Sequence, residues 1–250
     1  MLWLDEASKF IAEYASTLLG SGAYTSRVVR CSARIAKALG LEVEMITSHA
    51  NMILTVGDGR AFLTKIVKTP RYPIRFELNA DLCRLSWLAV DDGLSLRQIK
   101  RLYELALAKP RMDSVFTLFI ASFANASFCR LFDGDALAMA IVFSSTLVGF
   151  SAKQFLQKRG VNEYLVFIVS SFFASVCSAS ALCFDCAAET ALATSPLFLI
   201  PGVPLINGVI DILDGHTIAG CTRLIKGMIL VICIAVGLSL TLALVKGGLM

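Results

Sequence analysis

A segment in the second half of the chain combines prolines, glycines and polar residues with an otherwise apolar composition. It covers residues 195–211 and reads SPLFLIPGVPLINGVID. Proline removes a backbone donor and clashes with the preceding helical turn, so this segment is predicted to be a broken helix. At membrane depth the freed backbone groups must bind protein or water in a cavity, and broken helices of this kind bind substrates or ions. The candidate pathway residues in it are Pro201, Gly202, Pro204, Asn207 and Asp211.

The carboxylate of Asp211 is a candidate for ion chemistry. Asn207 and Asp211 are four residues apart, so they share one face of a helix. An ionisable group at or near membrane depth is a functional hypothesis by default, and Asp211 could carry a proton or hold a cation. The alternative is a carboxylate at the membrane interface that is paired with Arg223 or Lys226.

Other polar residues extend the candidate pathway. Asp214 and His216 follow at the predicted cytoplasmic end, where they are candidates for gating or proton transfer. Glu189 marks the opposite mouth, where the alternative is a solvated loop. Asn125 lies among small and polar residues of an earlier apolar segment, and the alternative there is a packed bundle with no path through it.

Membrane-spanning helices are needed to position these residues. Of the 250 residues, 56% are hydrophobic, whereas soluble domains contain about 45–50% apolar residues. Charges recur throughout residues 1–110 and cluster into short loops in residues 111–250, which predicts two domains with these bounds. A span needs about 20 mostly apolar residues, and this length predicts spans over residues 113–131, 136–154, 164–184, 190–210 and 227–245. Small and hydroxyl-bearing residues in the first three spans predict close contacts between helices.

The basic residues of the loops predict an orientation. One side carries seven bases and the other carries two, namely Lys109, Arg111, Lys153, Lys158, Arg159, Arg223 and Lys226 against Arg130 and Lys246. Basic loops stay in the cytoplasm, so the N-terminus is predicted to be cytoplasmic and, after five spans, the C-terminus to be outside. The start of the sequence, MLWLDE, lacks the basic and apolar regions of a signal peptide.

Residues 1–110 are predicted to form an α+β domain. Two helices come first, and the second begins near Thr25 or Ser26, either of which could cap it. The hydrophobic period then changes to two, with strands over residues 42–47, 52–56, 61–67 and 72–78 and a hairpin turn at Asp58-Gly59. Helices over residues 81–90 and 96–108 close the domain. The predicted fold is therefore an α+β cytosolic domain followed by an all-α membrane domain of about five transmembrane helices, the fourth broken by prolines.

The sequence lacks the common motifs of catalysis and of nucleotide binding. There is no Gly-x-Gly-x-x-Gly, no P-loop and no His-Glu-x-x-His, so we expect no enzyme activity and no cofactor. The turn before the second helix, with Gly20 and Gly22, could bind an anion near Arg27 and Arg30. The alternative is a helix–helix turn with a solvated basic face.

The charge and cysteine patterns exclude other classes of partner. The net charge of +4 contains no basic tract of the kind that binds nucleic acid. Cys183 and Cys186 form a Cys-x-x-Cys, which is typical of a metal or redox site. The two histidines, His49 and His216, are far apart, so we expect no metal and interpret these cysteines as small apolar side chains. A disulfide is the exception if that end of the span faces an oxidising compartment.

Two parts of the chain resemble the threonine/serine exporter family. The string Pro201-Gly202-Val203-Pro204-Leu205-Ile206-Asn207, followed by Asp211 and Gly215-His216, resembles the membrane motif of that family. Residues 22–28 (GAYTSRV) and 34–40 (RIAKALG) are similar to its cytosolic domain, although Tyr24 and the Val28-Val29 pair stand where a smaller residue and an acidic one are expected. The resemblance covers nearly the whole chain.

The resemblance implies a function and partners. Members of the family are single long chains or split pairs, and with one set of spans this chain resembles the large subunit of the split form. Export of threonine, serine or short dicarboxylates across the bacterial inner membrane is implied, driven by the proton gradient. The implied partners are the lipid bilayer, a small membrane protein that supplies the remaining helices, the small-molecule substrate, and further copies of the chain in a higher oligomer.

Two other functions stay open on the sequence alone. A membrane-anchored sensor or assembly protein would bind a ligand or a partner through its cytosolic domain, and the whole chain would transport nothing. A membrane-anchored enzyme would show turnover by residues 1–108, but the missing catalytic motifs argue against it.

Overall fold

The computed structural model describes residues 2–47, 51–70, 74–110, 112–184 and 186–248. Its elements form two compact units. Unit 1 comprises Met1–Pro110 together with Val203–Ile225, and unit 2 comprises Arg111–Gly202 together with Lys226–Met250. Part of the proline-rich segment therefore belongs to the same unit as the N-terminal residues.

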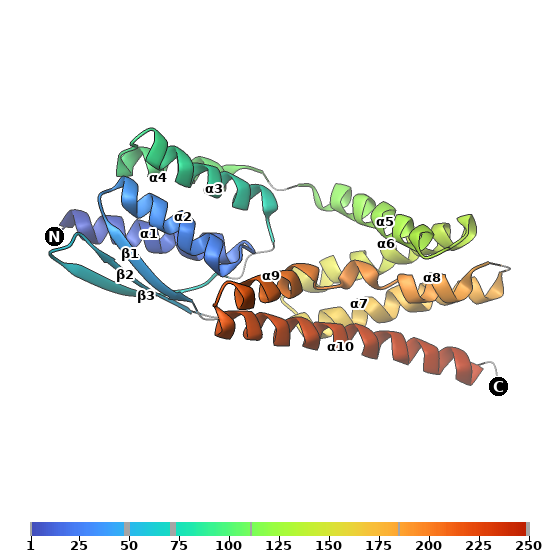
Figure 1. Cartoon of the computed structure of the whole chain (residues 1–250). Helices are drawn as coiled ribbons and strands as arrows, with labels where there is room; N and C mark the ends of the chain where they lie inside the picture. Colours follow the sequence, from blue (N-terminus) through green and yellow to red (C-terminus); the bar gives the residue numbers. More distant parts are fainter. Residues whose placement is uncertain (1, 48–50, 71–73, 111, 185, 249–250) are drawn as a thin grey trace. The chain divides into compact units, whose positions relative to one another are not determined.

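Helices predominate in the described residues, and a small sheet lies in unit 1 (Figure 1). The elements of unit 1 are α1 (Leu2–Gly20), α2 (Thr25–Ala38), β1 (Glu42–Thr47), β2 (Asn51–Gly57), β3 (Phe62–Lys68), α3 (Phe76–Asp91), α4 (Leu96–Ala108), nearly all of α9 (Gly202–Leu213) and the first turns of α10 (Thr217–Gly248). Those of unit 2 are α5 (Ser114–Leu131), α6 (Ala136–Lys158), α7 (Glu163–Ser178), η1 (Ala179–Cys183), α8 (Ala188–Thr194), η2 (Leu197–Leu199) and the rest of α10.

The three strands form an antiparallel sheet in the order β1-β2-β3. On the central strand the side chains of Met52, Leu54 and Val56 are buried, as their alternation with polar or exposed positions predicts. The hairpin between β2 and β3 turns at Asp58-Gly59, and Gly59 has a φ of +82°. The predicted Asp-Gly hairpin is confirmed.

The strand predicted over residues 72–78 is wrong in its second half. Residues 72 and 73 lie outside the described residues, and α3 already begins at Phe76. Leu78 and Leu82 are both buried and lie four residues apart, so the helical period extends further toward the N-terminus than predicted.

The helices of unit 1 pack on the sheet and on one another. α1 contacts β2 and β3, and α2 contacts β1. Tyr14 of α1 is fully buried, and its hydroxyl donates to the carbonyl oxygen of Leu82 on α3 at 2.8 Å. The hydroxyls of Thr17 and Tyr103 share a hydrogen bond of 2.8 Å, which ties α1 to α4. These buried hydroxyls of Tyr14, Thr17 and Tyr103 are thus satisfied, whereas the buried hydroxyl of Ser32 on α2 has no hydrogen-bond partner among the described residues.

In unit 1, α9 and the start of α10 form a helical hairpin. Gly215 has a φ of +87° in the turn, and the backbone N–H of His216 donates to the carbonyl oxygen of Asp211 at 2.7 Å. A Cβ atom added at Gly220 would lie 2.6 Å from the carbonyl oxygen of Gly208. The two glycines therefore allow the helices to approach closely at this crossing.

Helices of membrane-spanning length occur in the described residues as predicted. Four are long and apolar enough, namely Ser114–Leu131, Ala136–Lys158, Glu163–Cys183 and Thr217–Val245. A fifth is added if the interrupted pair Ala188–Leu199 and Gly202–Leu213 is one span. The helix that contains the last predicted span, residues 227–245, begins at Thr217 and continues through Arg223 and Lys226.

Small residues bring the helices of unit 2 together. A Cβ atom added at Gly149 on α6 would lie 2.7 Å from the Cβ of Ala174 on α7. The Ser171 hydroxyl on α7 donates to the carbonyl oxygen of Ile234 on α10 at 2.8 Å. The close helix contacts predicted from small and hydroxyl-bearing residues are confirmed here.

Candidate functional site

The carboxylate of Asp211 is completely buried in unit 1 and binds three donors. Its Oδ1 accepts a hydrogen bond from the backbone N–H of Thr25 at 2.7 Å, and its Oδ2 accepts one from the Thr25 hydroxyl at 3.0 Å. The Nε of Arg223 lies 3.1 Å from the same Oδ2. Both carboxylate oxygens are occupied, so the arrangement is a closed ion pair and not an open cation site.

The turn before α2 binds the same helical hairpin through its carbonyl groups. The Nδ2 of Asn207 donates to the carbonyl oxygen of Gly22 at 2.8 Å. The Nη2 of Arg223 donates to the carbonyl oxygen of Ala23 at 3.0 Å. Both α9 and α10 are therefore tied to this turn. We name the Asp211 site the set of Gly22, Ala23, Thr25, Asn207, Asp211 and Arg223.

The N-terminus of α2 explains why a carboxylate binds here. Thr25 is the first residue of α2, and the first N–H groups of a helix lack partners within the helix and carry the positive end of its dipole. The preceding residue, Tyr24, has an extended backbone and makes no capping bond with its side chain. The prediction that Thr25 or Ser26 caps α2 is therefore wrong, because the carboxylate of Asp211 takes the place of a cap. The anion at this turn is a side chain of the chain itself.

The side chains on α9 reach the turn because they share one helix face. Asn207 and Asp211 are four residues apart, and both are buried. The hairpin at Gly215 then brings Arg223 of α10 beside Asp211. Of the two predicted alternatives for an ion pair, the structure shows the one with Arg223, whereas Lys226 pairs with Glu163 at 3.0 Å. A proton or cation role of Asp211 stays a prediction.

Asn125 forms a second polar cluster, in unit 2. Its Nδ2 donates to the hydroxyl of Thr146 on α6 at 2.7 Å. It also donates to the carbonyl oxygens of Thr194 at 3.3 Å and Ser195 at 3.2 Å, where α8 ends. Asn125 thus satisfies backbone acceptors that the end of a helix leaves without intrahelical partners.

The chain after α8 departs from a regular helix within the proline-rich segment. Pro196 has no N–H to donate to the carbonyl oxygen of Leu192, and the hydroxyl of Ser195 donates to that oxygen instead, at 3.0 Å. Beyond η2, Ile200 and Pro201 lie outside any helix. α9 then includes Pro204 in its first turn, where a missing N–H removes no helical hydrogen bond. That the prolines cause the interruption stays a prediction.

The remaining predicted residues have different surroundings. Glu189 is exposed on α8 and lines a hollow of about 430 Å³ in unit 2 with Phe132 and Leu197. Asp214 is exposed and His216 is half-buried at the turn of the α9–α10 hairpin in unit 1. The structure thus brings Asn207 and Asp211 into one cluster, and other predicted residues lie in unit 2, namely Asn125, Glu189, Pro201 and Gly202.

The sequence alone does not predict the contact of Thr25 with Asp211 or the position of Lys153 in the interior of α6. The sequence predicts Thr25 only as a possible helix cap, although its position after Gly22 and its place in a family-like string are signals of a further role. The sequence predicts Lys153 as one of the loop bases, but α6 continues to Lys158. The Nζ of Lys153 lies 5.5 Å and 5.3 Å from the ring centroids of Phe150 and Phe167. A cation inside a membrane helix is a functional candidate.

The Cys-x-x-Cys lies near the end of α7 in unit 2. Cys183 is exposed, and the Cys186 thiol donates to the carbonyl oxygen of Ala181 at 3.4 Å. The interpretation of the pair as small apolar side chains stays a prediction.

Comparison with known proteins defines the class of this chain. The family described as "Putative threonine/serine exporter" matches residues 9–245, which is nearly the whole chain. The chain therefore belongs to the threonine/serine exporter family, as the resemblance predicted, and is a multi-pass membrane protein.

Two curated relatives are similar over nearly their full lengths. A Klebsiella aerogenes protein named "Probable succinate transporter subunit YjjP" is 27% identical over 248 residues, which cover 96% of this chain and 95% of the relative. An Escherichia coli (strain K12) protein of the same name is 27% identical over 232 residues, which cover 91% of this chain and 90% of the relative. No solved structure matches the chain.

Proposed function

We propose that the chain is one subunit of a secondary exporter of small dicarboxylates such as succinate. Membership of the exporter family supports export, and the name of the two relatives supports a dicarboxylate substrate and a second subunit. The second subunit is a small membrane protein that supplies further helices. Threonine and serine are substrates of the same small polar class and belong in the same test.

The buried ion pair between Asp211 and Arg223 is the main structural support for this function. Replacing a buried ion pair with well-packed apolar residues is often neutral or stabilising, so stability alone does not account for such a pair. This one lies directly after the Pro201–Asn207 motif, on the segment that resembles the exporter family.

Arg223 gives the site a means of binding a carboxylate substrate. The planar guanidinium matches the geometry of a carboxylate, so a dicarboxylate that reaches the site competes with Asp211 for Arg223. A proton on Asp211 neutralises the charge that holds Arg223 and leaves the guanidinium to the substrate. Proton binding and substrate binding are coupled in this way, because both require the Asp211–Arg223 pair to open. The same step weakens the hydrogen bonds to Thr25 and frees the hairpin from the turn before α2.

We place Arg223, and with it the Asp211 site, at the cytoplasmic end of α10. The last span candidate has 29 residues, or roughly 43 Å at about 1.5 Å per residue, which exceeds the hydrocarbon thickness of about 30 Å. Its first turns, with Arg223, therefore extend beyond the core of the bilayer. Without Lys153, six bases remain on this side against two on the other, and this bias supports a cytoplasmic N-terminus and a C-terminus on the outer side of the bacterial inner membrane.

Efflux from preloaded cells tests the proposed function. Bacteria that lack both subunits are made to produce this chain, the proposed small membrane partner, both or neither, and are then loaded with labelled succinate, threonine or serine. We expect efflux of succinate with both proteins and background efflux in the other three cases. If neither succinate nor the two amino acids leave the cell faster, with both proteins found in the membrane, the proposed function is wrong.

A further inference from the structure

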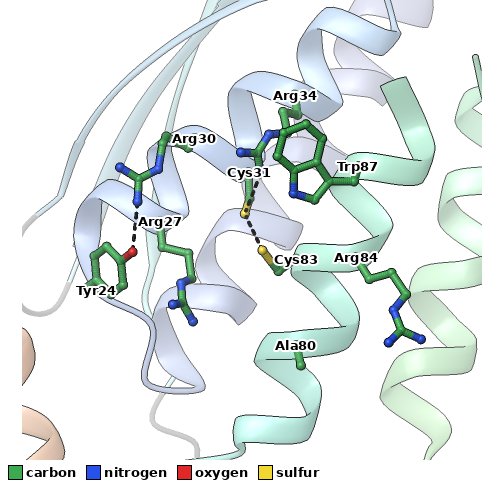
Figure 2. Close-up of a pocket in the computed structure, with 9 residues that line it drawn as sticks. All are labelled: Tyr24, Arg27, Arg30, Cys31, Arg34, Ala80, Cys83, Arg84 and Trp87. Carbon is green, nitrogen blue, oxygen red and sulfur yellow. Dashed lines mark hydrogen bonds between the residues drawn. The ribbon is translucent and has the colours of Figure 1, made fainter. Parts of the chain in front are cut away.

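A pocket with an unusual concentration of arginine lies between α2 and α3 in unit 1. It has a volume of about 420 Å³, which is within the range of about 300–1,000 Å³ for small-molecule sites. Figure 2 shows α2 along one wall and α3 along the other. Its polar and aromatic lining consists of Tyr24, Arg27, Arg30, Arg34, Arg84 and Trp87. We name it the arginine pocket.

The positive charges of this pocket have no carboxylate partner among the described residues that line it. Arg27, Arg30 and Arg34 recur at spacings of three and four residues, so they share one face of α2 and repel one another. The fourteen residues of α2 include no aspartate or glutamate. Among the described residues that line the pocket there are four guanidinium groups and no carboxylate. A bound anion would remove this repulsion.

Aromatic side chains hold three of these guanidinium groups in place. The guanidinium carbon of Arg34 lies 3.6 Å from the centroid of the Trp87 ring. That of Arg27 lies 4.7 Å from the centroid of the Tyr24 ring, and the Nη2 of Arg30 donates to the Tyr24 hydroxyl at 2.9 Å. Stacking fixes an arginine while leaving its N–H edge available for hydrogen bonds. The pocket is therefore organised before a ligand binds.

A nearby carboxylate on α3 is already paired elsewhere. Asp81 lies one residue from Ala80, which lines the pocket, but its Oδ2 binds the Nζ of Lys109 at 2.7 Å. The Asp211 carboxylate is likewise held by Thr25 and Arg223. These two carboxylates are therefore engaged outside the pocket.

We propose that the arginine pocket binds a small organic or inorganic anion with two negative charges on oxygen, the chemistry shared by dicarboxylates and phosphate esters. Guanidinium groups from two helices can each take one end of such an anion in charge-assisted hydrogen bonds. Tyr24, which touches two of the arginines, stands between Ala23 and Thr25 of the Asp211 site, so a ligand here lies next to the turn that binds α9 and α10. The site is separate from Asp211, and its existence does not depend on the proposed function.

Trp87 provides a direct readout of binding. The chain has two tryptophans, and Trp3→Phe leaves Trp87 as the one that remains. The full-length Trp3→Phe protein is purified in detergent, and its fluorescence is titrated at constant ionic strength with succinate, inorganic phosphate, sodium chloride and neutral succinamide. We expect a saturable change at millimolar or lower concentrations with succinate, phosphate or both, and none with chloride or succinamide.

Variants of exposed arginines distinguish this pocket from other anion sites. Combining Arg30→Gln with Arg84→Gln removes one guanidinium group from each wall of the pocket and leaves the Arg34–Trp87 stack in place. Each of the two substitutions is expected to weaken anion binding by about tenfold or more. Arg101→Gln, an exposed arginine of α4 outside the pocket, is the matched control and should bind normally. Equilibrium dialysis with labelled succinate and phosphate repeats the comparison without relying on fluorescence.

The two anions identify the source of the ligand. Binding of succinate assigns the pocket to the class of transported dicarboxylates, and binding of phosphate alone assigns it to phosphate compounds unrelated to transport. Both results support the site. Failure of both anions to bind in either measurement, or equal binding by the double variant and the Arg101→Gln control, would overturn it.

Discussion

The Nε of Arg223 lies 3.1 Å from the Oδ2 of Asp211, and that carboxylate has no exposed surface. The same carboxylate binds the backbone and the hydroxyl of Thr25, 186 residues earlier in the chain. One buried side chain therefore joins the family-like membrane motif to the first turn of α2. The function that we propose depends on whether this junction opens during transport.

Asp211→Asn should lower the rate of efflux per molecule of the protein present in the membrane. Asparagine can still accept a hydrogen bond from Thr25. Its amide cannot bind and release a proton, and it does not neutralise the positive charge of Arg223. We expect at least a tenfold loss of the partner-dependent efflux rate, equivalent to about 1.4 kcal/mol in activation free energy. Efflux is normalised to the membrane level measured by immunoblot.

Glu104→Gln is the matched control for this variant. It likewise replaces a carboxylate by an amide in unit 1, but this carboxylate is exposed and lies on α4, outside the Asp211 site. It should leave efflux unchanged. Normal efflux by Asp211→Asn would remove Asp211 from the mechanism.

The effects of replacing Asp211 and of replacing Arg223 on the free energy of unfolding should be strongly coupled. Losing one partner leaves an uncompensated buried charge, so Asp211→Asn and Arg223→Gln are each expected to lower the free energy of unfolding by about 3–5 kcal/mol. The double variant leaves no buried charge and should be less destabilised than the sum of the two. Thermal unfolding of the purified variants in detergent measures this, and additive effects would show that the two side chains do not interact.

The α9–α10 hairpin should not tolerate a side chain at Gly220. A methyl group there would lie 2.6 Å from the carbonyl oxygen of Gly208, so Gly220→Ala must push the helices apart. We expect a loss of about 1–3 kcal/mol in the free energy of unfolding. Gly202→Ala is the control, because a Cβ atom there meets nothing within 4 Å. Equal melting temperatures for the two variants would contradict the close packing of this hairpin.

Asn125→Ala should destabilise unit 2. It leaves the carbonyl oxygens of Thr194 and Ser195 without their amide donor, which costs about 1–3 kcal/mol when such groups are buried. Ser127→Ala, on the exposed face of the same helix, removes a hydroxyl that binds the Phe123 carbonyl oxygen of its own helix and should have little effect. Resistance to denaturation by detergent compares the two, and no difference between them would argue against this role of Asn125.

The ion pairs of Asp5 on α1 should stabilise the folded state to an extent that depends on pH. Hydrogen bonds from Lys65 and then Lys9 lower the pKa of Asp5 from 3.8 to about 2. Because the pKa is lowered in the folded state, this contribution is fully present above pH 3.8 and is lost as the pH falls toward 2. Asp5→Asn should therefore lower the melting temperature slightly at pH 7, and the difference should disappear near pH 2. A difference that is the same at both pH values would show that the ion pairs are not its cause.

The sequence predicted those parts of the structure that depend on local patterns. The alternation of Met52, Leu54 and Val56, the turn at Asp58-Gly59 and the apolar lengths of the membrane helices are signals within a few residues or turns. The error over residues 76–78 arises because packing prevails over the local pattern. Aromatic and apolar residues there favour a strand, but the buried positions of Leu78 and Leu82 are set by packing of α3 within unit 1.

The Asp211 site could be predicted only in part. The four-residue spacing of Asn207 and Asp211 gave one face of α9, and Arg223 was one of two expected partners. No local pattern joins these residues to Thr25, because that contact arises when distant parts of the chain fold together. The arginine pocket was visible in the sequence as Arg27 and Arg30, whereas Arg84 and Trp87 come from another helix.

Transport by purified components tests the central claim most directly. The chain and its small membrane partner are reconstituted together into liposomes loaded with labelled succinate, and a pH gradient is imposed across the bilayer. We predict gradient-dependent release of succinate that requires both proteins and is lost in Asp211→Asn. Release that is absent with both proteins correctly inserted, or that proceeds equally without a gradient and with Asp211→Asn, would contradict a proton-coupled exporter built on the Asp211–Arg223 pair.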